Sequence, residues 1–432
     1  MNTSLDPESQ KILELLENVS ENIFLTGNAG TGKSTLLDHF RQVTRKNISV
    51  VAPTGVAAVN VKGETIHSFF GFPPNITAEK AAQEAKKTKK SKLFRALEVL
   101  VIDEISMVRA DLLDSIDCFL RVVRQKAHPF GGVRLIMVGD LHQLPPVVTF
   151  SEKEALAALY ESPYFFSSQV FRSLFDSLLP QLKLIEMNTI FRQTDKNFTA
   201  LLNRIRNKQT TPRDLELLNQ NLLTADEALD NYIILTAINH QADELNQLKI
   251  QEIEGPLHTF TAVRSGNFSS SQFPAAESLT LKTGARVMLL NNDPQGRWIN
   301  GTLGTLFRVL ADSVYVKIDG GELEKVEPVT WSSYKTVFRE STQTLDSEII
   351  GSFKQMPLRL AWAITIHKSQ GKTFDKVAID LGRGAFAHGQ TYVALSRCTS
   401  LAGLRLFRPL YSESIIVDPR VLAFLSSLRA SL

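Results

Sequence analysis

The fold class of this chain is decided by the stretch Asn22-Ile23-Phe24-Leu25-Thr26-Gly27-Asn28-Ala29-Gly30-Thr31-Gly32-Lys33-Ser34-Thr35. The apolar run 23–25 predicts a buried strand, and residues 34–40 predict a helix. The loop between them fits G-x-x-x-x-G-K-[ST], in the strand–loop–helix context that this motif requires. The matching residues are Gly27, Gly32, Lys33 and Ser34. This arrangement predicts an α/β fold with a parallel sheet.

The loop is a predicted phosphate site. Its glycines let successive backbone N–H groups point into one concavity, and the positive end of the following helix favours the same anion. The Lys33 side chain would neutralise the β- and γ-phosphates of a nucleoside triphosphate, and the Ser34 hydroxyl would hold Mg²⁺. A glycine-rich turn without a ligand is the alternative, but it does not account for the spacing. The expected nucleotide contacts are Gly27, Asn28, Ala29, Gly30, Thr31, Gly32, Lys33, Ser34 and Thr35.

An acid pair follows a second buried run further along the chain. Residues 99–102 predict a strand that ends at Asp103 and Glu104. After a phosphate loop, such a pair is typical of nucleotide hydrolases: Asp103 would hold Mg²⁺ through water, and Glu104 would orient or deprotonate the attacking water. A solvated acidic strand end is the alternative.

Another strand, residues 135–140, leads to Gln143. Because Gln143 comes at the carboxyl end of a strand beside the nucleotide strands, it can reach a γ-phosphate. Its amide would then report whether that phosphate is present.

Composition describes an ordinary globular protein. The 432 residues are 43% hydrophobic and 22% charged, and this length predicts two to four domains. No apolar run approaches the length of a membrane span, and the residues from Met1 show no signal-peptide pattern. Only two cysteines occur, Cys118 and Cys398, which fits a reducing compartment. We therefore expect a cytoplasmic protein without a membrane partner.

The charge is unevenly distributed. Residues 351–432 carry a net charge of +7, and the remaining 350 residues carry about −4. A basic segment on a near-neutral chain suggests a local site for a polyanion. The lysine run at 86–92 is either a solvated helix face or a surface that contacts phosphates.

The pattern of elements predicts three structural units. A first α/β domain spans 1–188 with a small insertion at about 61–98, and a second α/β domain comprises 189–278 and 350–432. Between them, short strands at 286–290, 304–309, 313–318 and 324–329 predict a small inserted β-barrel at 279–349.

Two arginines of the second domain, Arg192 and Arg397, have no acidic neighbour in the sequence. If the two α/β domains face each other, these side chains can stabilise charge on a transferring γ-phosphate. The alternative for each arginine is an ordinary surface position.

Six motifs together resemble those of superfamily-one DNA helicases: residues 27–35, 101–106, 138–146, 190–193, 365–373 and 393–397. More narrowly, residues 107–124, 130–134 and 139–147 are similar to the Pif (petite integration frequency) helicases, which are related to RecD-like helicases. The chain lacks the long N-terminal extension of many eukaryotic members, which favours a bacterial or core-only form.

The resemblance implies two RecA-like domains and an ATP- and Mg²⁺-dependent DNA helicase that moves 5′-to-3′ on single-stranded DNA. It implies that Gln10 reads adenine, Gln143 senses the γ-phosphate, Arg192 and Arg397 are arginine fingers, and Gly371 contacts the nucleotide. Single-stranded DNA and forked or tailed duplex are the expected partners, with a monomer when free. G-quadruplexes and RNA–DNA hybrids stay open as substrates, as do roles in replication, repair and telomere maintenance.

The resemblance also implies a DNA path across both domains. Hydroxyls and backbone amides along it can hold phosphates, and aromatic rings can stack bases. Phe69 and Phe72 are candidates for stacking, although such residues more often belong to a core. The expected DNA contacts are Pro53, Thr54, Gly55, His67, Phe69, Thr365, His367, Lys368 and Ser369.

Other functions compete with this interpretation. A nucleotide kinase or a clamp-loader-type ATPase would lack the second α/β domain with its own arginines. A DNA-dependent remodeller or clamp without strand separation is the remaining alternative, and the intact set of Lys33, Asp103 and Glu104 argues against loss of hydrolysis.

Overall fold

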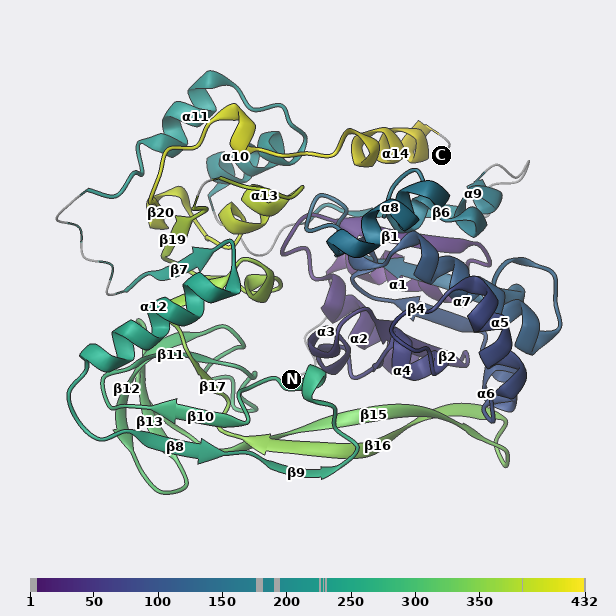
Figure 1. Ribbon diagram of the computed structural model, residues 1–432, viewed down its shortest axis with the longest axis horizontal. Coiled ribbons are helices and arrows are strands. Elements are labelled where there is room, and N and C mark those ends of the chain that lie inside the picture. The colour runs from purple at the N-terminus through teal and green to yellow at the C-terminus, as the bar shows by residue number, and fades with distance from the viewer. Residues whose placement is uncertain are drawn as a thin grey trace.

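Two parallel sheets and a set of antiparallel strands make up the computed structural model (Figure 1). The structure describes residues 6–175, 182–189, 195–224, 227, 229, 231–382 and 384–430. The first sheet and its helices lie at the right of the figure, the second at the upper left, and the antiparallel strands along the lower edge. The expectation of two parallel α/β domains is confirmed.

Six strands form the first sheet in the order β3-β2-β4-β5-β1-β6, and all neighbouring pairs are parallel. The strands are β1 (Asn22–Gly27), β2 (Ile48–Ala52), β3 (Glu64–Thr65), β4 (Val99–Ile102), β5 (Arg134–Val138) and β6 (Leu182–Met187). Because the strands are parallel, the segments that follow β1, β4 and β5 leave from the same edge of the sheet. This edge is where ligands bind in open α/β sheets.

The first sheet is buried on both faces, which explains its continuous apolar runs. Ile23 and Leu25 pack in one cluster with α1 and α2, whereas Phe24 packs on the other face in the cluster that contains α7. The helices of this part are α1 (Pro7–Asn18), α2 (Lys33–Val43), α3 (Gly55–Asn60), α4 (Ile66–Phe70), α5 (Ala78–Lys87), α6 (Ser91–Ala96), α7 (Ala110–Arg124), α8 (Phe150–Leu159) and α9 (Gln169–Phe175).

The second sheet has four parallel strands in the order β18-β7-β19-β20. They are β7 (Ile233–Thr236), β18 (Ala363–Thr365), β19 (Val377–Asp380) and β20 (Leu404–Leu406). The accompanying helices are α10 (Lys196–Arg206), α11 (Pro212–Asn219), α12 (Asn239–Glu252) and α13 (Gln390–Leu395).

Antiparallel strands are inserted between β7 and β18. They are β8 (His258–Thr261), β9 (Val263–Gly266), β10 (Ser278–Leu281), β11 (Arg286–Leu289), β12 (Leu303–Val309), β13 (Val314–Ile318), β14 (Leu323–Val326), β15 (Val329–Arg339), β16 (Thr344–Gln355) and β17 (Leu358–Leu360). Five form a sheet in the order β14-β13-β12-β11-β17, in which β14 and β17 are the edges. Strands β8, β9 and β17 lie outside the expected barrel range of 279–349: β8 pairs with β10, β17 pairs with β11, and β9 pairs with the part of β16 beyond residue 349.

The long hairpin of β15 and β16 runs beneath the first domain (Figure 1). The hydroxyls of Ser49 in β2 and Thr336 in β15 are 3.0 Å apart. The Leu345 N–H donates to Asn47 Oδ1 at 3.0 Å. The inserted strands therefore contact the first domain through this hairpin.

The last helix, α14 (Pro419–Ala430), returns from the second domain to the first. The ring of Phe424 stacks on that of Phe166 with their centroids 4.4 Å apart. Val421, Leu425 and Leu428 join the core cluster that contains Phe24. The two parallel-sheet domains are thus tied together at the C-terminal end.

Neither α14 nor any other helix of the described residues is long and apolar enough to cross a membrane.

Candidate active site

The phosphate loop connects β1 to α2, and glycine gives it its shape. Gly32 has a φ of 84°, a left-handed conformation that other residues rarely adopt. A Cβ on Gly27 would lie 2.7 Å from the carbonyl oxygen of Met187 in the neighbouring strand β6. Because α2 begins at Lys33, its positive N-terminal end lies at the loop. The loop has the geometry that the motif predicts.

The side chain of Lys33 folds back onto the phosphate loop. Its ammonium donates hydrogen bonds to the carbonyl oxygens of Gly27 at 2.9 Å and Asn28 at 3.0 Å. Burial raises the pKa values of Asp103 and Glu104, and the charge of the same ammonium opposes that rise in both. Lys33 and the acid pair therefore share one site, as the sequence predicts.

The acid pair lies at the carboxyl end of β4 in a buried setting. Burial, together with the neighbouring Glu104, raises the pKa of Asp103 to about 7. Burial also raises the pKa of Glu104, and the charge of Asp140 raises it further. Glu104 adopts a left-handed conformation, with φ of 51° and ψ of 43°, directly after the strand. A carboxylate with a raised pKa is suited to accept a proton from water.

Gln143 is buried beside the acid pair and is hydrogen-bonded to a carboxylate. Its Nε2 donates to Oδ2 of Asp140 at 3.3 Å, and the Gln143 N–H donates to the Asp140 carbonyl at 2.9 Å. Asp140 is fully buried at the end of β5. Burial alone would raise the pKa of Asp140, but the charge of the Arg206 guanidinium holds this pKa well below its usual range. An ionised Asp140 thus orients the amide of Gln143.

Arg397 reaches this site from the second domain. It is fully buried after α13, and its charge lowers the pKa of Glu104. Its Nε donates to the Val393 carbonyl at 2.9 Å, and its Nη1 approaches the Ser369 carbonyl at 3.4 Å. The structure therefore brings Arg397 near the acid pair, as expected. Arg192 lies outside the described residues, so its role stays a prediction.

Two other predicted nucleotide contacts, Gln10 and Gly371, are exposed. Gln10 is exposed on α1, in the turn whose Glu8 accepts hydrogen bonds from the N–H groups of Asn188 and Thr189 at 3.0 Å each. Gly371 has a φ of 75° and is exposed. Their contacts with a nucleotide stay predictions.

The predicted DNA contacts of the first domain form a half-buried patch at α3 and α4. Thr54 caps α3, since its hydroxyl accepts the Ala57 N–H at 3.3 Å. Pro53 is half-buried and Gly55 is buried beside it. His67 is half-buried in α4, and burial lowers its pKa. A neutral His67 can donate or accept a hydrogen bond but carries no charge for a phosphate.

Phe69 is the wrong candidate for base stacking. Its side chain is fully buried, and its ring packs edge-on against Phe70 at 4.9 Å and Phe94 at 5.2 Å between centroids. Phe72 is buried in the same cluster and stacks on Phe70. These rings form the core beneath α4 because α5, α6 and α7 cover them.

The loop after β18 divides its predicted DNA contacts into two kinds. His367 and Lys368 are exposed, whereas the side chains of Thr365 and Ser369 are buried. The Ser369 hydroxyl donates to the Ile366 carbonyl at 2.7 Å, and the Lys368 N–H donates to the Thr365 hydroxyl at 3.4 Å. Direct contact of DNA with the side chains of Thr365 and Ser369 is therefore wrong for this conformation; both side chains fix the loop that presents the exposed pair.

Comparison of the sequence with known proteins identifies a helicase family. The family model described as PIF1-like helicase matches residues 4–215. The ATP-dependent DNA helicase Pif1 of Bdellovibrio bacteriovorus is 36% identical to 97% of this chain, and the match covers 91% of that protein. The chain belongs to the PIF1-like helicase family. It spans only 62% of the length of the human ATP-dependent DNA helicase PIF1, to which it is 35% identical over 95% of its residues.

Three solved structures of this family bear on the conformation. Unliganded Pif1 from Bacteroides sp. is 38% identical and aligns with a TM-score of 0.88, covering 98% of this chain and 97% of that one. Bacteroides Pif1 bound to single-stranded DNA has the same identity and covers 99% and 97%, but its TM-score is 0.66. Equal identity with a lower TM-score means that the parts are placed differently in the DNA complex. Bacteroides sp. Pif1 in complex with ADP-AlF4 also aligns with a TM-score of 0.89, so the present structure resembles the arrangement without DNA.

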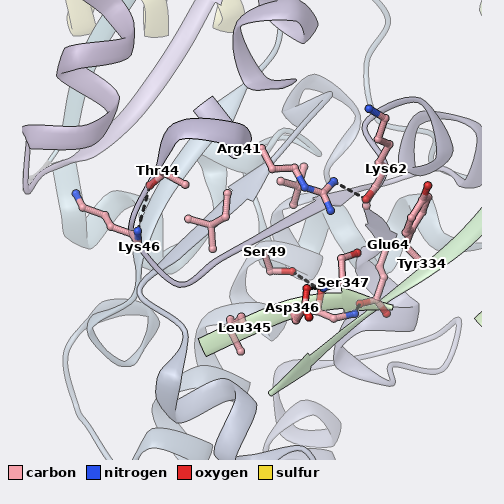
Figure 2. A pocket seen from close by; sticks show the side chains of 14 residues that line it. Arg41, Thr44, Lys46, Ser49, Lys62, Glu64, Tyr334, Leu345, Asp346 and Ser347 are labelled. Atoms are coloured by element: carbon pink, nitrogen blue, oxygen red, sulfur yellow. Dashed lines mark hydrogen bonds between the residues drawn. The ribbon is translucent and has the colours of Figure 1, made fainter. Parts of the chain in front are cut away.

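A second polar pocket lies away from the phosphate loop, between β2 and the β15–β16 hairpin (Figure 2). It has a volume of about 260 Å³ and is lined by Arg41, Lys62, Glu64, Tyr334 and Asp346 among others. None of the predicted site residues lines it. In this PIF1-like helicase the pocket belongs to the contact between the hairpin and the first domain.

Sequence reasoning missed several residues of the second domain that reach the nucleotide edge of the first. Asn28 Nδ2 donates to Asn203 Oδ1 at 3.0 Å, and Tyr392 lines a small pocket together with Asn28 and Ala29. Arg206 forms an ion pair with Asp140 at 3.0 Å. Asp140 was visible as the residue that ends a predicted strand, whereas Asn203 and Tyr392 carry no motif signal in the sequence.

Proposed function

We propose that this protein is an ATP-dependent DNA helicase that moves 5′-to-3′ on single-stranded DNA and separates the duplex. The observation that carries the proposal is the convergence of both domains on the phosphate loop and the acid pair. Asn28 of the loop is hydrogen-bonded to Asn203 of the second domain at 3.0 Å. Burial raises the pKa of Glu104, and the charges of Lys33 from the first domain and Arg397 from the second oppose that rise. A nucleotide at the phosphate loop would lie between the domains, so its hydrolysis would change their arrangement.

The residues present fit a magnesium-bound nucleotide. The Ser34 hydroxyl and the Asp103 carboxylate are oxygen ligands of the kind that Mg²⁺ prefers, and a cation would stabilise Asp103 in its ionised form. Among the described residues, no group of three or more His, Cys, Asp or Glu could hold a metal by itself. This matches an ion held largely by nucleotide phosphates, where it would neutralise their charge.

Each protein group of the site then has one task. Lys33 neutralises the phosphates, and Glu104 orients or deprotonates the attacking water. Gln143 senses the γ-phosphate, and Arg397 stabilises the charge that develops on it. Arg192 acts with Arg397, while Gln10 reads the adenine edge and Gly371 contacts the nucleotide. Both arginines would complete the site only when the domains close.

The DNA strand would cross half-buried groups of the first domain and exposed groups of the second. Backbone amides beside Thr54, together with His67, His367 and Lys368, supply contacts that tolerate any sequence. The antiparallel strands between residues 258 and 360 form a small barrel-like module, inserted in the second domain, that clasps the strand. Single-stranded DNA and forked or tailed duplex are the substrates, and the protein acts as a cytoplasmic monomer when free.

The proposal is tested by ATPase activity with and without a single-stranded oligonucleotide. We expect strong stimulation by the oligonucleotide, because DNA bound across both domains favours the closed arrangement in which Arg397 meets the γ-phosphate. A nucleotide kinase or an isolated switch would not respond to single strands. Equal turnover with and without DNA would contradict the proposal.

Direction of movement has its own test. A motor that moves 5′-to-3′ displaces streptavidin from a biotin at the 3′ end of an oligonucleotide, but not from one at the 5′ end. Displacement from the 5′ end alone would reverse the assigned polarity while leaving the ATPase assignment intact.

Glu104→Gln is expected to separate binding from hydrolysis. The substitution keeps the shape of the side chain but removes the group that activates water, a contribution of roughly 10²- to 10⁴-fold to the rate. ATP affinity and DNA binding should persist, and the nucleotide- and DNA-bound state should accumulate. Equilibrium binding of a fluorescent ATP analogue, alongside steady-state turnover, measures both properties.

Glu98→Gln serves as the control for Glu104→Gln. Glu98 precedes the opposite end of β4, is exposed, and accepts the Asn47 N–H at 2.7 Å. It should leave turnover unchanged. A collapse of nucleotide affinity in Glu104→Gln would mean that Glu104 binds the metal instead.

A further inference from the structure

A buried ion pair joins the two parallel-sheet domains next to the γ-phosphate sensor. Nη2 of Arg206, at the end of α10, lies 3.0 Å from Oδ1 of Asp140, at the end of β5. The two side chains are 9% and 0% exposed. The pair therefore links a helix of the second domain to the nucleotide edge of the first sheet.

Both carboxylate oxygens of Asp140 accept hydrogen bonds, and the donors come from both domains. Oδ1 accepts from Arg206 and from the His142 N–H at 3.1 Å, whereas Oδ2 accepts from Nε2 of Gln143 at 3.3 Å. A rotation of this carboxylate would disturb all three hydrogen bonds together. The position of Arg206 is thus coupled to the orientation of the Gln143 amide through one rigid group.

The same short segment is held at two further points by the second domain. Nε2 of His388 donates to the Leu141 carbonyl at 2.7 Å, while its Nδ1 accepts the Asp418 N–H at 2.8 Å. A Cβ on Gly389 would lie 2.4 Å from the His142 carbonyl oxygen. Residues 140–143 therefore cannot shift without moving the second domain, because interfaces packed this closely do not deform continuously.

Stability alone does not explain this pair. A buried ion pair is often no better for stability than apolar residues of similar volume, and its best-attested use is to fix one specific arrangement. Within the described part of the chain, Nε of Arg206 also has no hydrogen-bond partner, so the guanidinium is not fully satisfied here. If this contact between the domains must change during each cycle of ATP hydrolysis, both the burial of the ion pair and the unpartnered Nε of Arg206 are explained.

We propose that Arg206 is a positioning residue that couples the two domains to the γ-phosphate sensor: through Asp140 it sets the amide of Gln143, and it transmits the sensor's state to the second domain. This inference rests on the proposed helicase function. It assigns to the Arg206–Asp140 pair the coupling between DNA bound across both domains and hydrolysis at the phosphate loop.

The test compares two arginines of the same helix. Arg204 lies two residues earlier on α10 and pairs with Asp214 at 2.6 Å within the second domain. Arg204→Ala and Arg206→Ala each remove one charge and one ion pair from α10. The measurements are basal kcat, kcat with saturating oligonucleotide, KM for ATP and thermal stability.

We expect Arg206→Ala to lower the ratio of DNA-stimulated to basal kcat by roughly 5- to 150-fold, the range of typical couplings between sites. KM for ATP should change little, because the phosphate loop supplies most ground-state contacts. Arg204→Ala should keep the wild-type ratio even if its melting temperature falls. A wild-type ratio in Arg206→Ala would overturn the inference.

A second variant keeps the test decisive if Arg206→Ala folds poorly. Asp140→Asn combined with Arg206→Gln removes both charges, so neither is left buried and unpaired, and it retains hydrogen-bonding groups. We expect recovered thermal stability without recovered stimulation by DNA. Wild-type stimulation in this double variant would overturn the inference. Absence of DNA stimulation in the wild-type protein would instead overturn the helicase function on which the inference rests.

Discussion

Lys33→Ala is expected to abolish nearly all ATP hydrolysis, with a loss of turnover of at least roughly 10²- to 10³-fold. The Lys33 ammonium donates hydrogen bonds to the carbonyl oxygens of Gly27 and Asn28 in the phosphate loop. Its positive charge also favours the ionised form of Asp103. Its removal weakens nucleotide binding and stabilisation of the transition state together. Steady-state ATPase with saturating oligonucleotide and ATP measures the loss.

The fold should survive the Lys33 substitution, because the hydrophobic clusters on both faces of the first sheet form without the Lys33 side chain. Lys46→Ala is the matched control: its ammonium donates to the Glu17 carbonyl, outside the loop. It should leave turnover unchanged. Undiminished DNA-stimulated turnover in Lys33→Ala would refute the nucleotide site.

Arg397→Ala should lower ATP turnover by roughly 10²-fold or more, as the loss of an arginine finger does. The guanidinium acts on Glu104 from the second domain, so its effect requires both domains. Nucleotide affinity should change much less, because the phosphate loop supplies most ground-state contacts. Binding of DNA should persist, while its dependence on nucleotide should fade. The measurements are steady-state turnover and equilibrium binding of each ligand.

Arg397→Lys should not rescue turnover, since an ammonium lacks the planar fork that matches phosphate oxygens. Arg405→Ala is the control in the same domain. Arg405 belongs to β20 and forms its ion pair with Glu227 rather than with the acid pair. Near wild-type turnover in Arg397→Ala would mean that the second domain does not complete the site. The same experiment with Arg192→Ala tests the other predicted finger.

The elements that position the nucleotide site could be read from the sequence because their cause is local. Parallel strands covered on both faces must be apolar throughout, so the runs at 23–25 and 99–102 predict β1 and β4 directly. The phosphate loop is equally local: its turn requires glycine at fixed positions, and Gly32 shows the predicted left-handed backbone.

The DNA contacts could be predicted only to the level of segments. Hydroxyl and aromatic residues serve equally well as ligand contacts or as internal supports, and sequence does not tell which way they point. Phe69 belongs to a core that α5, α6 and α7 complete, so its environment depends on helices that follow it in the chain. Ser369 likewise bonds its own loop through its hydroxyl. The exposed His367 and Lys368 are the contacts that the structure leaves available.

Contacts between domains were beyond the reach of sequence patterns. Asp140 was visible at the end of a predicted strand, but its partner Arg206 lies 66 residues away in a helix that carries another arginine. Nothing local distinguishes Arg206, which pairs across the domains, from Arg204, which pairs within one. The return of α14 to the first domain depends on an aromatic surface built by other helices, including Phe166 and Phe171.

The central claim is that ATP hydrolysis between the two domains drives strand separation, and unwinding of tailed duplexes tests it most directly. We predict that the wild-type protein, with ATP and Mg²⁺, separates a duplex carrying a 5′ single-stranded tail but not one with a 3′ tail or blunt ends. Arg397→Ala, assayed in parallel, should bind the 5′-tailed substrate without separating it. DNA-stimulated hydrolysis without separation of any tailed duplex would contradict the account and indicate a remodeller or clamp instead.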